Sequence, residues 1–172
     1  MVVFALLRRN TNILNKQNMT TEEIIKKVQS FEDACQVLGL AIPEGLPELL
    51  QPKNAEIVPP NIVALMKLQI ITAALNQGWT WVPDGETRAY YAWFWFFTQE
   101  ELDKMDASEK EFRHIIPADG FSKLAGLGYG DSDDAWPHSH AGLGARLAYR
   151  NGALARHSAR QFIDLWKQYL FE

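Results

Sequence analysis

The residues with the greatest potential for chemistry lie in a glycine-rich stretch of the second half of the chain. Three carboxylates and two imidazoles follow one another closely there: Asp131, Asp133, Asp134, His138 and His140. Neighbouring carboxylates repel one another unless a cation or an arginine lies among them. Imidazole nitrogens suit a transition metal, and carboxylate oxygens suit calcium. These residues therefore predict a divalent metal site, which a metal-dependent enzyme would use.

A polar surface loop is the alternative interpretation of the same residues. The stretch lacks the glycine and the closing glutamate of an EF-hand, and the chain contains no HExxH motif. Aspartates in loops commonly form Asx-turns and face water. We favour this interpretation and keep the metal site, at residues 131–140, as the alternative.

Other catalytic signatures are incomplete. Gly126, Gly128 and Gly130 are spaced like a phosphate cradle, but an acidic stretch follows them instead of a helix N-terminus. Ser139 lacks the flanking glycines of a nucleophile elbow. Cys35 is the single cysteine and lies in a helical pattern, where a cysteine is usually a small buried apolar residue. We therefore favour a function without catalysis.

Aromatic and basic side chains supply a second set of candidates. Tryptophan and tyrosine dominate binding hot spots, and residues 79–95 are rich in both. The predicted ligand-binding residues are Trp79, Trp81, Tyr90, Tyr91, Trp93, Arg146 and Arg150, and Trp95 lies in the same stretch. Packing in the core is the alternative for the aromatic residues.

The arginines of the C-terminal region allow two interpretations. Arg146 and Arg150 are expected on one strand face, and Arg156 and Arg160 lie one helical turn apart. They can hold an anionic ligand or pair with the acidic segment 98–119, which holds seven acids and three bases. We favour pairing. His157 is expected to be exposed on the same helix.

Composition limits the classes of function. The chain has 172 residues, 47% of them hydrophobic, which suits one globular domain. A net charge of −4 argues against a nucleic-acid binder, which needs a basic surface. No apolar run reaches the roughly 20 residues of a membrane-spanning helix. We expect no membrane partner and a cytoplasmic protein, or one carried in a virion.

The chain divides into an appendage and a domain. Residues 1–18 are basic and lack periodicity, so we expect a flexible appendage, and Met19 is the expected natural start. A basic arm that docks on an acidic partner is the alternative. Residues 19–172 form the single predicted domain.

The domain is predicted to have an α+β fold. Helices are expected over residues 21–29, 30–38 and 61–76, and shorter ones from 98 and 108. Strands are expected over 89–97, 122–129 and 142–150, where apolar residues alternate or cluster. We expect the N-terminal helices to pack on a small, mainly antiparallel sheet. One amphipathic helix after Asn151-Gly152 closes it.

Four segments resemble a known family. They are FEDACQVLGL, IITAALNQGW, YYAWF and GLGARLAYRNGALARHSARQFIDLWKQYL, and together they fall within residues 22–171. The chain resembles a family of small uncharacterised proteins found in gut Bacteroidetes and in their phages and mobile elements. The resemblance implies a phage or mobile-element origin and implies no activity, cofactor or site.

The leading hypothesis is a non-enzymatic interaction module that binds a protein partner or a second copy of itself. It would act through the aromatic residues of 79–95 and the loop of 130–141. The alternatives are a metal-dependent enzyme that uses the Asp131–His140 stretch and a structural component of a phage virion.

Overall fold

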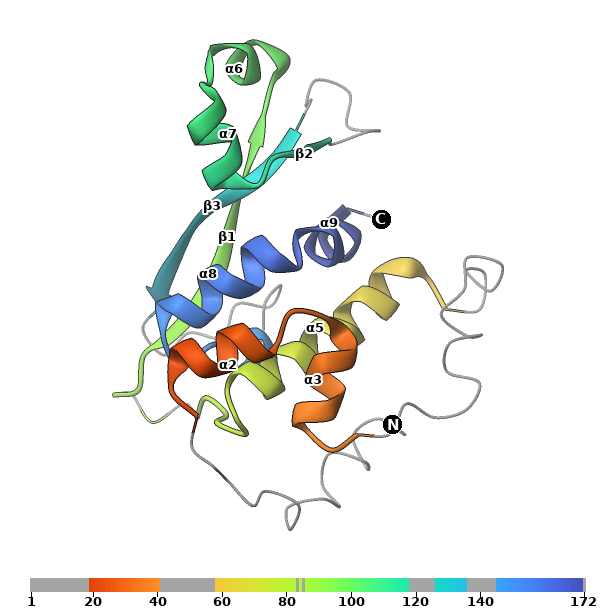
Figure 1. Ribbon diagram of the computed structural model, residues 1–172, viewed down its shortest axis with the longest axis vertical. Helices are drawn as coiled ribbons and strands as arrows, with labels where there is room; N and C mark the ends of the chain where they lie inside the picture. Colours follow the sequence, from red (N-terminus) through yellow and green to blue (C-terminus); the bar gives the residue numbers. More distant parts are fainter. Residues whose placement is uncertain are drawn as a thin grey trace.

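The computed structural model has the α+β fold that the sequence predicts (Figure 1). It describes residues 19–40, 58–82, 84, 86–117, 126–135 and 145–171. The appendage predicted over residues 1–18 lies outside these ranges.

Two short helices open the described part of the chain, α2 (Thr21–Lys27) and α3 (Phe31–Val37). Each begins with a capping box, in which a hydroxyl residue and an acid three positions later bond to each other's backbone N–H. The pairs are Thr20 with Glu23 and Ser30 with Asp33. Reciprocal caps of this kind stabilise helices too short to persist alone.

The central helix is α5 (Pro60–Leu75). Proline suits its first position, because the missing N–H would have no partner there. The helix ends where Gln77 and Gly78 take positive φ angles of 51° and 81°, a conformation that glycine adopts without steric cost. One broad face of α5 is buried, and its buried residues are Val63, Ala64, Leu68, Ile71, Thr72, Ala74 and Leu75.

The sheet has three antiparallel strands in the order β1-β3-β2. The predicted strand 89–97 is confirmed as β1 (Ala89–Phe97). The next strand, β3 (Gly126–Ala135), continues through residues 130–135, which we predicted as loop. That prediction rested on polar composition, and pairing with the hydrophobic β1 overrides this weak preference. The short β2 (Ile116–Pro117) completes the sheet.

The predicted third strand, residues 142–150, is wrong over its described part. Residues Ala145–Leu147 form the 3-10 helix η2, and only an isolated bridge joins Tyr149 to Tyr90. The buried Asn76 side chain explains this geometry. Its Nδ2 donates to Ala148 O at 2.8 Å, and its Oδ1 accepts from Arg150 N at 3.1 Å. A side chain thus satisfies the backbone groups that a strand ladder would otherwise satisfy.

Two capped helices follow β1, as predicted: α6 (Gln99–Lys104) and α7 (Ala107–Arg113). They lie at the far end of the strand pair (Figure 1). The glycines of β3 make room for them. A Cβ on Gly126 would lie 3.0 Å from Leu102 Cδ1, and one on Gly128 would overlap the Ile115 side chain. This close approach explains Gly126 and Gly128 without a bound phosphate.

The single C-terminal helix that we predicted is divided in two, α8 (Gly152–Gln161) and α9 (Ile163–Phe171). Phe162 separates them with φ −116° and ψ 31°. The division lets α8 lie against β1 and β3 while α9 lies against α5. The α2 helix packs on α8, and α3 packs on α5.

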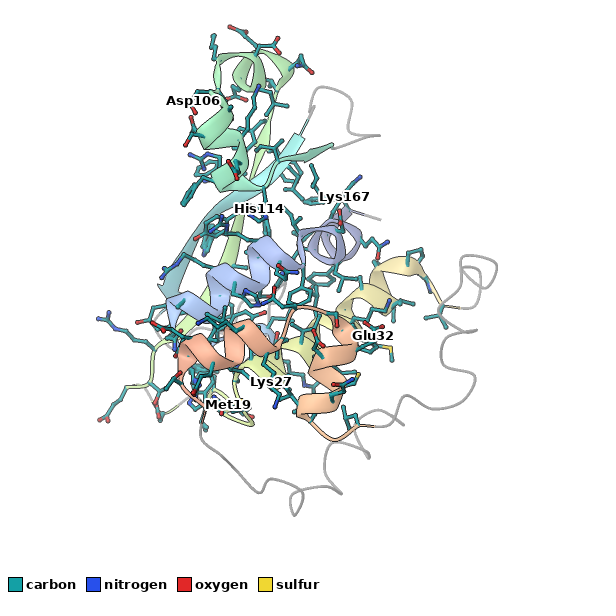
Figure 2. The ribbon with its side chains drawn as sticks, in the orientation of Figure 1. Met19, Lys27, Glu32, Asp106, His114 and Lys167 are labelled. Atoms are coloured by element: carbon teal, nitrogen blue, oxygen red, sulfur yellow. The ribbon has the colours of Figure 1, made fainter. Side chains whose placement is uncertain are left out.

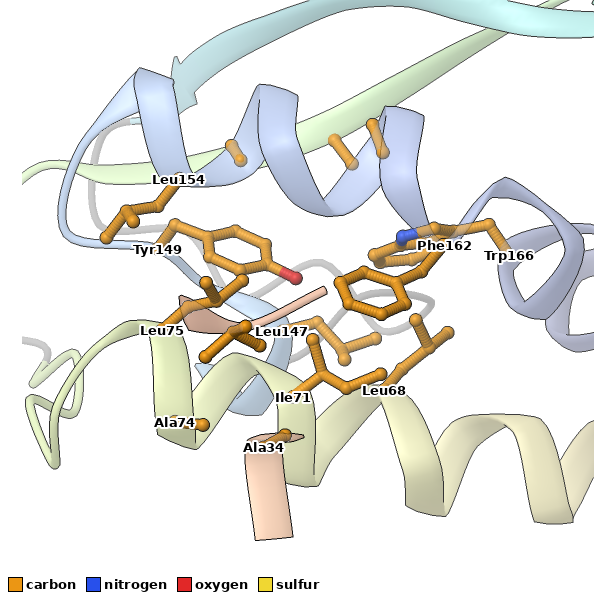
Figure 3. Packing of buried hydrophobic residues seen from close by; sticks show 14 of the residues in the cluster. Ala34, Leu68, Ile71, Ala74, Leu75, Leu147, Tyr149, Leu154, Phe162 and Trp166 are labelled. Carbon is orange, nitrogen blue, oxygen red and sulfur yellow. The ribbon is translucent and has the colours of Figure 1, made fainter. Parts of the chain in front are cut away.

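Tyr149 lies among the buried apolar residues that fill the core between α5 and α8 (Figure 3). Its hydroxyl is the centre of a buried polar network. The Tyr149 hydroxyl donates to Ser158 Oγ at 2.6 Å and lies 2.9 Å from Thr72 Oγ1. Trp166 Nε1 donates to Ser158 Oγ at 3.3 Å. Burial raises the pKa of Tyr149 to about 12, so the hydroxyl keeps its proton.

The network predicts how much removal of the Tyr149 hydroxyl lowers the stability of the protein. Replacing Tyr149 with Phe leaves Ser158 and Thr72 buried without this partner, so we expect a loss of about 1–3 kcal/mol in unfolding free energy. Urea denaturation measures it. Tyr91→Phe is the matched control, because Tyr91 is buried in a separate cluster. Equal denaturation midpoints for Tyr149→Phe and the wild type would contradict the role of this hydroxyl.

Candidate functional site

The predicted metal ligands fall partly on the sheet. Backbone pairing places Asp131 opposite Trp93, Asp133 opposite Tyr91 and Asp134 opposite Tyr90. The predicted ligands His138 and His140 lie outside the described residues. In the part of the chain that the structure describes, no three His, Cys, Asp or Glu residues form a group that could hold a metal ion. The metal site stays a prediction.

Several predicted binding aromatics pack inside the protein. Trp81, Ala89, Tyr91 and Ala148 form a buried cluster, and Trp79 packs against it half-buried. Trp81 Nε1 donates to Thr87 O at 2.9 Å, which fixes the indole ring. Burial of Trp81 and Tyr91 stabilises this end of the sheet, so these two rings are not accessible to a ligand in this conformation.

Two predicted aromatics of β1 are exposed. Trp93 is 52% exposed and Trp95 is 60% exposed. They lie two residues apart, hence on one face of the strand. The other face packs inward, because Phe94 lies 5.4 Å from Trp166 and Phe96 lies 4.5 Å from Phe171 between ring centroids. Exposed tryptophans at strand spacing form a flat apolar surface.

The backbone of β1 also has an edge that is largely unpaired among the described residues. Tyr90 exchanges two hydrogen bonds with Tyr149, at 3.0 and 2.8 Å, on the side away from β3. Backbone groups alternate in direction along a strand, so those of Ala92 and Phe94 face the same side. Beyond Tyr149, no described segment pairs with β1 at this edge.

The two predicted binding arginines of residues 142–150 do not share a strand face, because this segment is not a strand. Arg146 is exposed on η2. Arg150 is half-buried, and its backbone N–H donates to Asn76.

A cleft of about 360 Å³ opens between α2, α7 and α8. We call it the basic cleft, and it is lined by Ile25, His114, Ala153, Arg156, His157, Arg160 and Gln161. Sequence reasoning named Arg156 and Arg160 as possible ligands of an anion, but it did not place His114, His157 and Gln161 beside them. The available signal was the spacing of Arg156 and Arg160 with His157 and Gln161, two pairs at helical separation that present polar groups side by side.

Arg160 is held in place within the basic cleft. Its Nη2 lies 3.1 Å from His114 Nε2, and its guanidinium stacks over the Phe112 ring at 5.2 Å. A guanidinium nitrogen only donates, so His114 Nε2 accepts and His114 Nδ1 donates to Arg160 O at 3.2 Å. Figure 2 shows His114 between α7 and α8. Arg160 therefore contacts the acidic segment 98–119 through the Phe112 ring and the His114 imidazole.

His157 is half-buried, and the prediction that it is exposed is wrong. Its Nε2 lies 2.7 Å from Val28 O, and its ring packs edge-on against Phe162 at 6.0 Å. The α2 helix covers this face of α8, which the helical pattern alone does not reveal. Burial lowers the pKa of His157, and the hydrogen bond to Val28 opposes this shift only in part.

Comparison of the chain with known protein families, curated proteins and solved structures finds no match. The resemblance to proteins of Bacteroidetes and their phages stays a prediction. Among the described helices, none combines the length and apolar character that crossing a membrane requires.

The buried imidazole predicts a pH dependence of stability. The pKa of His157 is lower in the folded protein than its ordinary 6.5, so the unfolded chain takes up the proton first as pH falls. The contribution is intact above about pH 6.5 and is lost as pH drops toward the folded-state pKa. We expect His157→Gln to lose less stability across this window than the wild type. Urea denaturation along a pH series measures the difference, and parallel pH profiles would contradict it.

Proposed function

We propose that this protein is a non-enzymatic interaction module that binds an extended segment of a protein partner along β1. The exposure of Trp93 and Trp95 beside a strand edge that no described segment pairs with beyond Tyr149 carries the proposal. An unpaired edge offers N–H and C=O groups in the register that a further strand needs. Strand addition uses these groups for affinity and the flanking side chains for specificity.

Trp93 and Trp95 can supply a substantial part of a binding interface. Each can bury about 150–250 Å², whereas a standard interface buries roughly 800 Å² on each partner. Phe94 and Phe96 are held from behind by the rings of Trp166 and Phe171, which supports a strand already formed before binding. A preformed surface reduces the conformational entropy lost on association.

A second copy of the chain is the alternative partner. The same open edge favours it, because two β1 edges can pair about a two-fold axis. A virion component would assemble in this way, and that role, together with a phage origin, stays a prediction. The metal-dependent enzyme at Asp131, Asp133, Asp134, His138 and His140 also stays a prediction.

Strand addition predicts the properties of selected ligands. We expect a library of random linear peptides to yield binders that lose binding when alternate backbone amides are N-methylated, because methylation blocks the edge hydrogen bonds. We expect the Trp93→Ala, Trp95→Ala double variant to bind them at least about tenfold more weakly, as for hot-spot residues. Titration of fluorescent peptides measures both effects.

Ile62→Ala is the matched control, since Ile62 is an exposed apolar residue on α5. It should bind like the wild type. Sedimentation at rising protein concentration identifies the second-copy alternative, if a dimer forms that the double variant lacks. Peptides that bind the wild type and the double variant equally would contradict the proposed surface.

A further inference from the structure

The geometry points to a second binding site, in the basic cleft between α2, α7 and α8, for the phosphate group of a small phosphomonoester. This site does not depend on the β1 surface. It is built from Arg156, Arg160 and His157 of α8 and from His114 at the end of α7.

The charge of the lining favours an anion. Arg156 and Arg160 place two guanidinium groups on one face of α8, and the described lining residues include no carboxylate. Guanidinium groups bind phosphate oxygens with paired, directional hydrogen bonds. The net charge of the chain is −4, so the local excess of positive charge is a property of this cleft and not of the whole chain.

Arg160 is preorganised and incompletely bonded. The ring of Phe112 and the Nε2 of His114 hold its guanidinium. Its Nε is buried, and no described residue accepts a hydrogen bond from it. A buried donor without an acceptor is destabilising, so the described contacts alone do not explain why this guanidinium is held here. Because the Nε is enclosed, a ligand in the cleft would bind Arg160 through its other N–H groups.

The remaining polar groups suit a monoester with an organic part. His157 donates Nε2–H to Val28 O, so Nδ1 of the neutral ring can accept from a hydroxyl of the ligand's organic part. Gln161 uses its amide N–H for Gln29 O, which leaves its oxygen to accept from a ligand hydroxyl. Ile25 and Ala153 add an apolar wall. A volume of about 360 Å³ lies in the range of small-molecule pockets, roughly 300–1,000 Å³.

The test is a titration of the full chain with phenyl phosphate, inorganic phosphate and chloride at equal ionic strength. Calorimetry measures affinity, and NMR spectra of the histidine rings report the location. We expect phenyl phosphate to bind more tightly than inorganic phosphate, chloride to produce no saturable response, and the ring signals of His114 and His157 to shift.

Two arginine variants test the residues. We expect Arg156→Gln and Arg160→Gln each to weaken phenyl phosphate binding at least about tenfold, as removal of a charged donor does. Arg88→Gln is the matched control, because Arg88 is exposed and does not line the cleft. It should bind like the wild type. Arg156 is exposed, so its variant tests the site even if Arg160→Gln fails to fold.

The source of the phosphate is tested separately with phosphatidylcholine vesicles with and without phosphatidic acid. Binding that requires phosphatidic acid and both arginines would support the phosphate site and assign the ester to a lipid headgroup. A response to phosphate equal to that of chloride, or unchanged binding in Arg156→Gln, would overturn the proposal.

Discussion

The hydrogen bonds of Tyr149 fix the positions of three helices and the sheet relative to one another. Its hydroxyl joins Thr72 of α5 to Ser158 of α8, and Trp166 of α9 reaches the same serine. The Tyr149 backbone pairs with Tyr90 of β1. One residue therefore positions three helices relative to the sheet. Buried polar groups reward only the arrangement that satisfies all of them, so this network selects one packing among the many that apolar contacts alone would allow.

Local signals predicted most of the elements. The capping residues Thr20, Ser30 and Thr98 begin helices as expected, because their hydrogen bonds reach only three residues along the chain. The central helix α5 and the strand β1 follow from apolar periodicity and from aromatic content. The α+β class follows from these elements. The exposed tryptophans of β1 were predicted as binding residues, but composition could not separate them from the buried Trp81 and Tyr91.

Contacts between residues distant in sequence determined the features that local sequence patterns did not predict. Asn76 bonds to residues 148–150 and replaces the predicted strand ladder, and neither partner signals this locally. The basic cleft joins His114 to Arg160 across 46 residues. Polar composition indicated a loop over 130–135, whereas that segment pairs with the aromatic strand β1. In each case a long-range partner outweighed a weak local preference.

The division of the C-terminal region at Phe162 has a consequence for how this protein can change during evolution. An α-helix turns about 100° per residue, so inserting or deleting one residue at this joint would rotate α9 and move Trp166 out of the core that it fills. Phe162 at the joint is itself buried in this core, so its apolar character is restricted as well as the number of residues. Homologous chains should therefore conserve an apolar residue here together with the spacing between the serine of α8 and the tryptophan of α9.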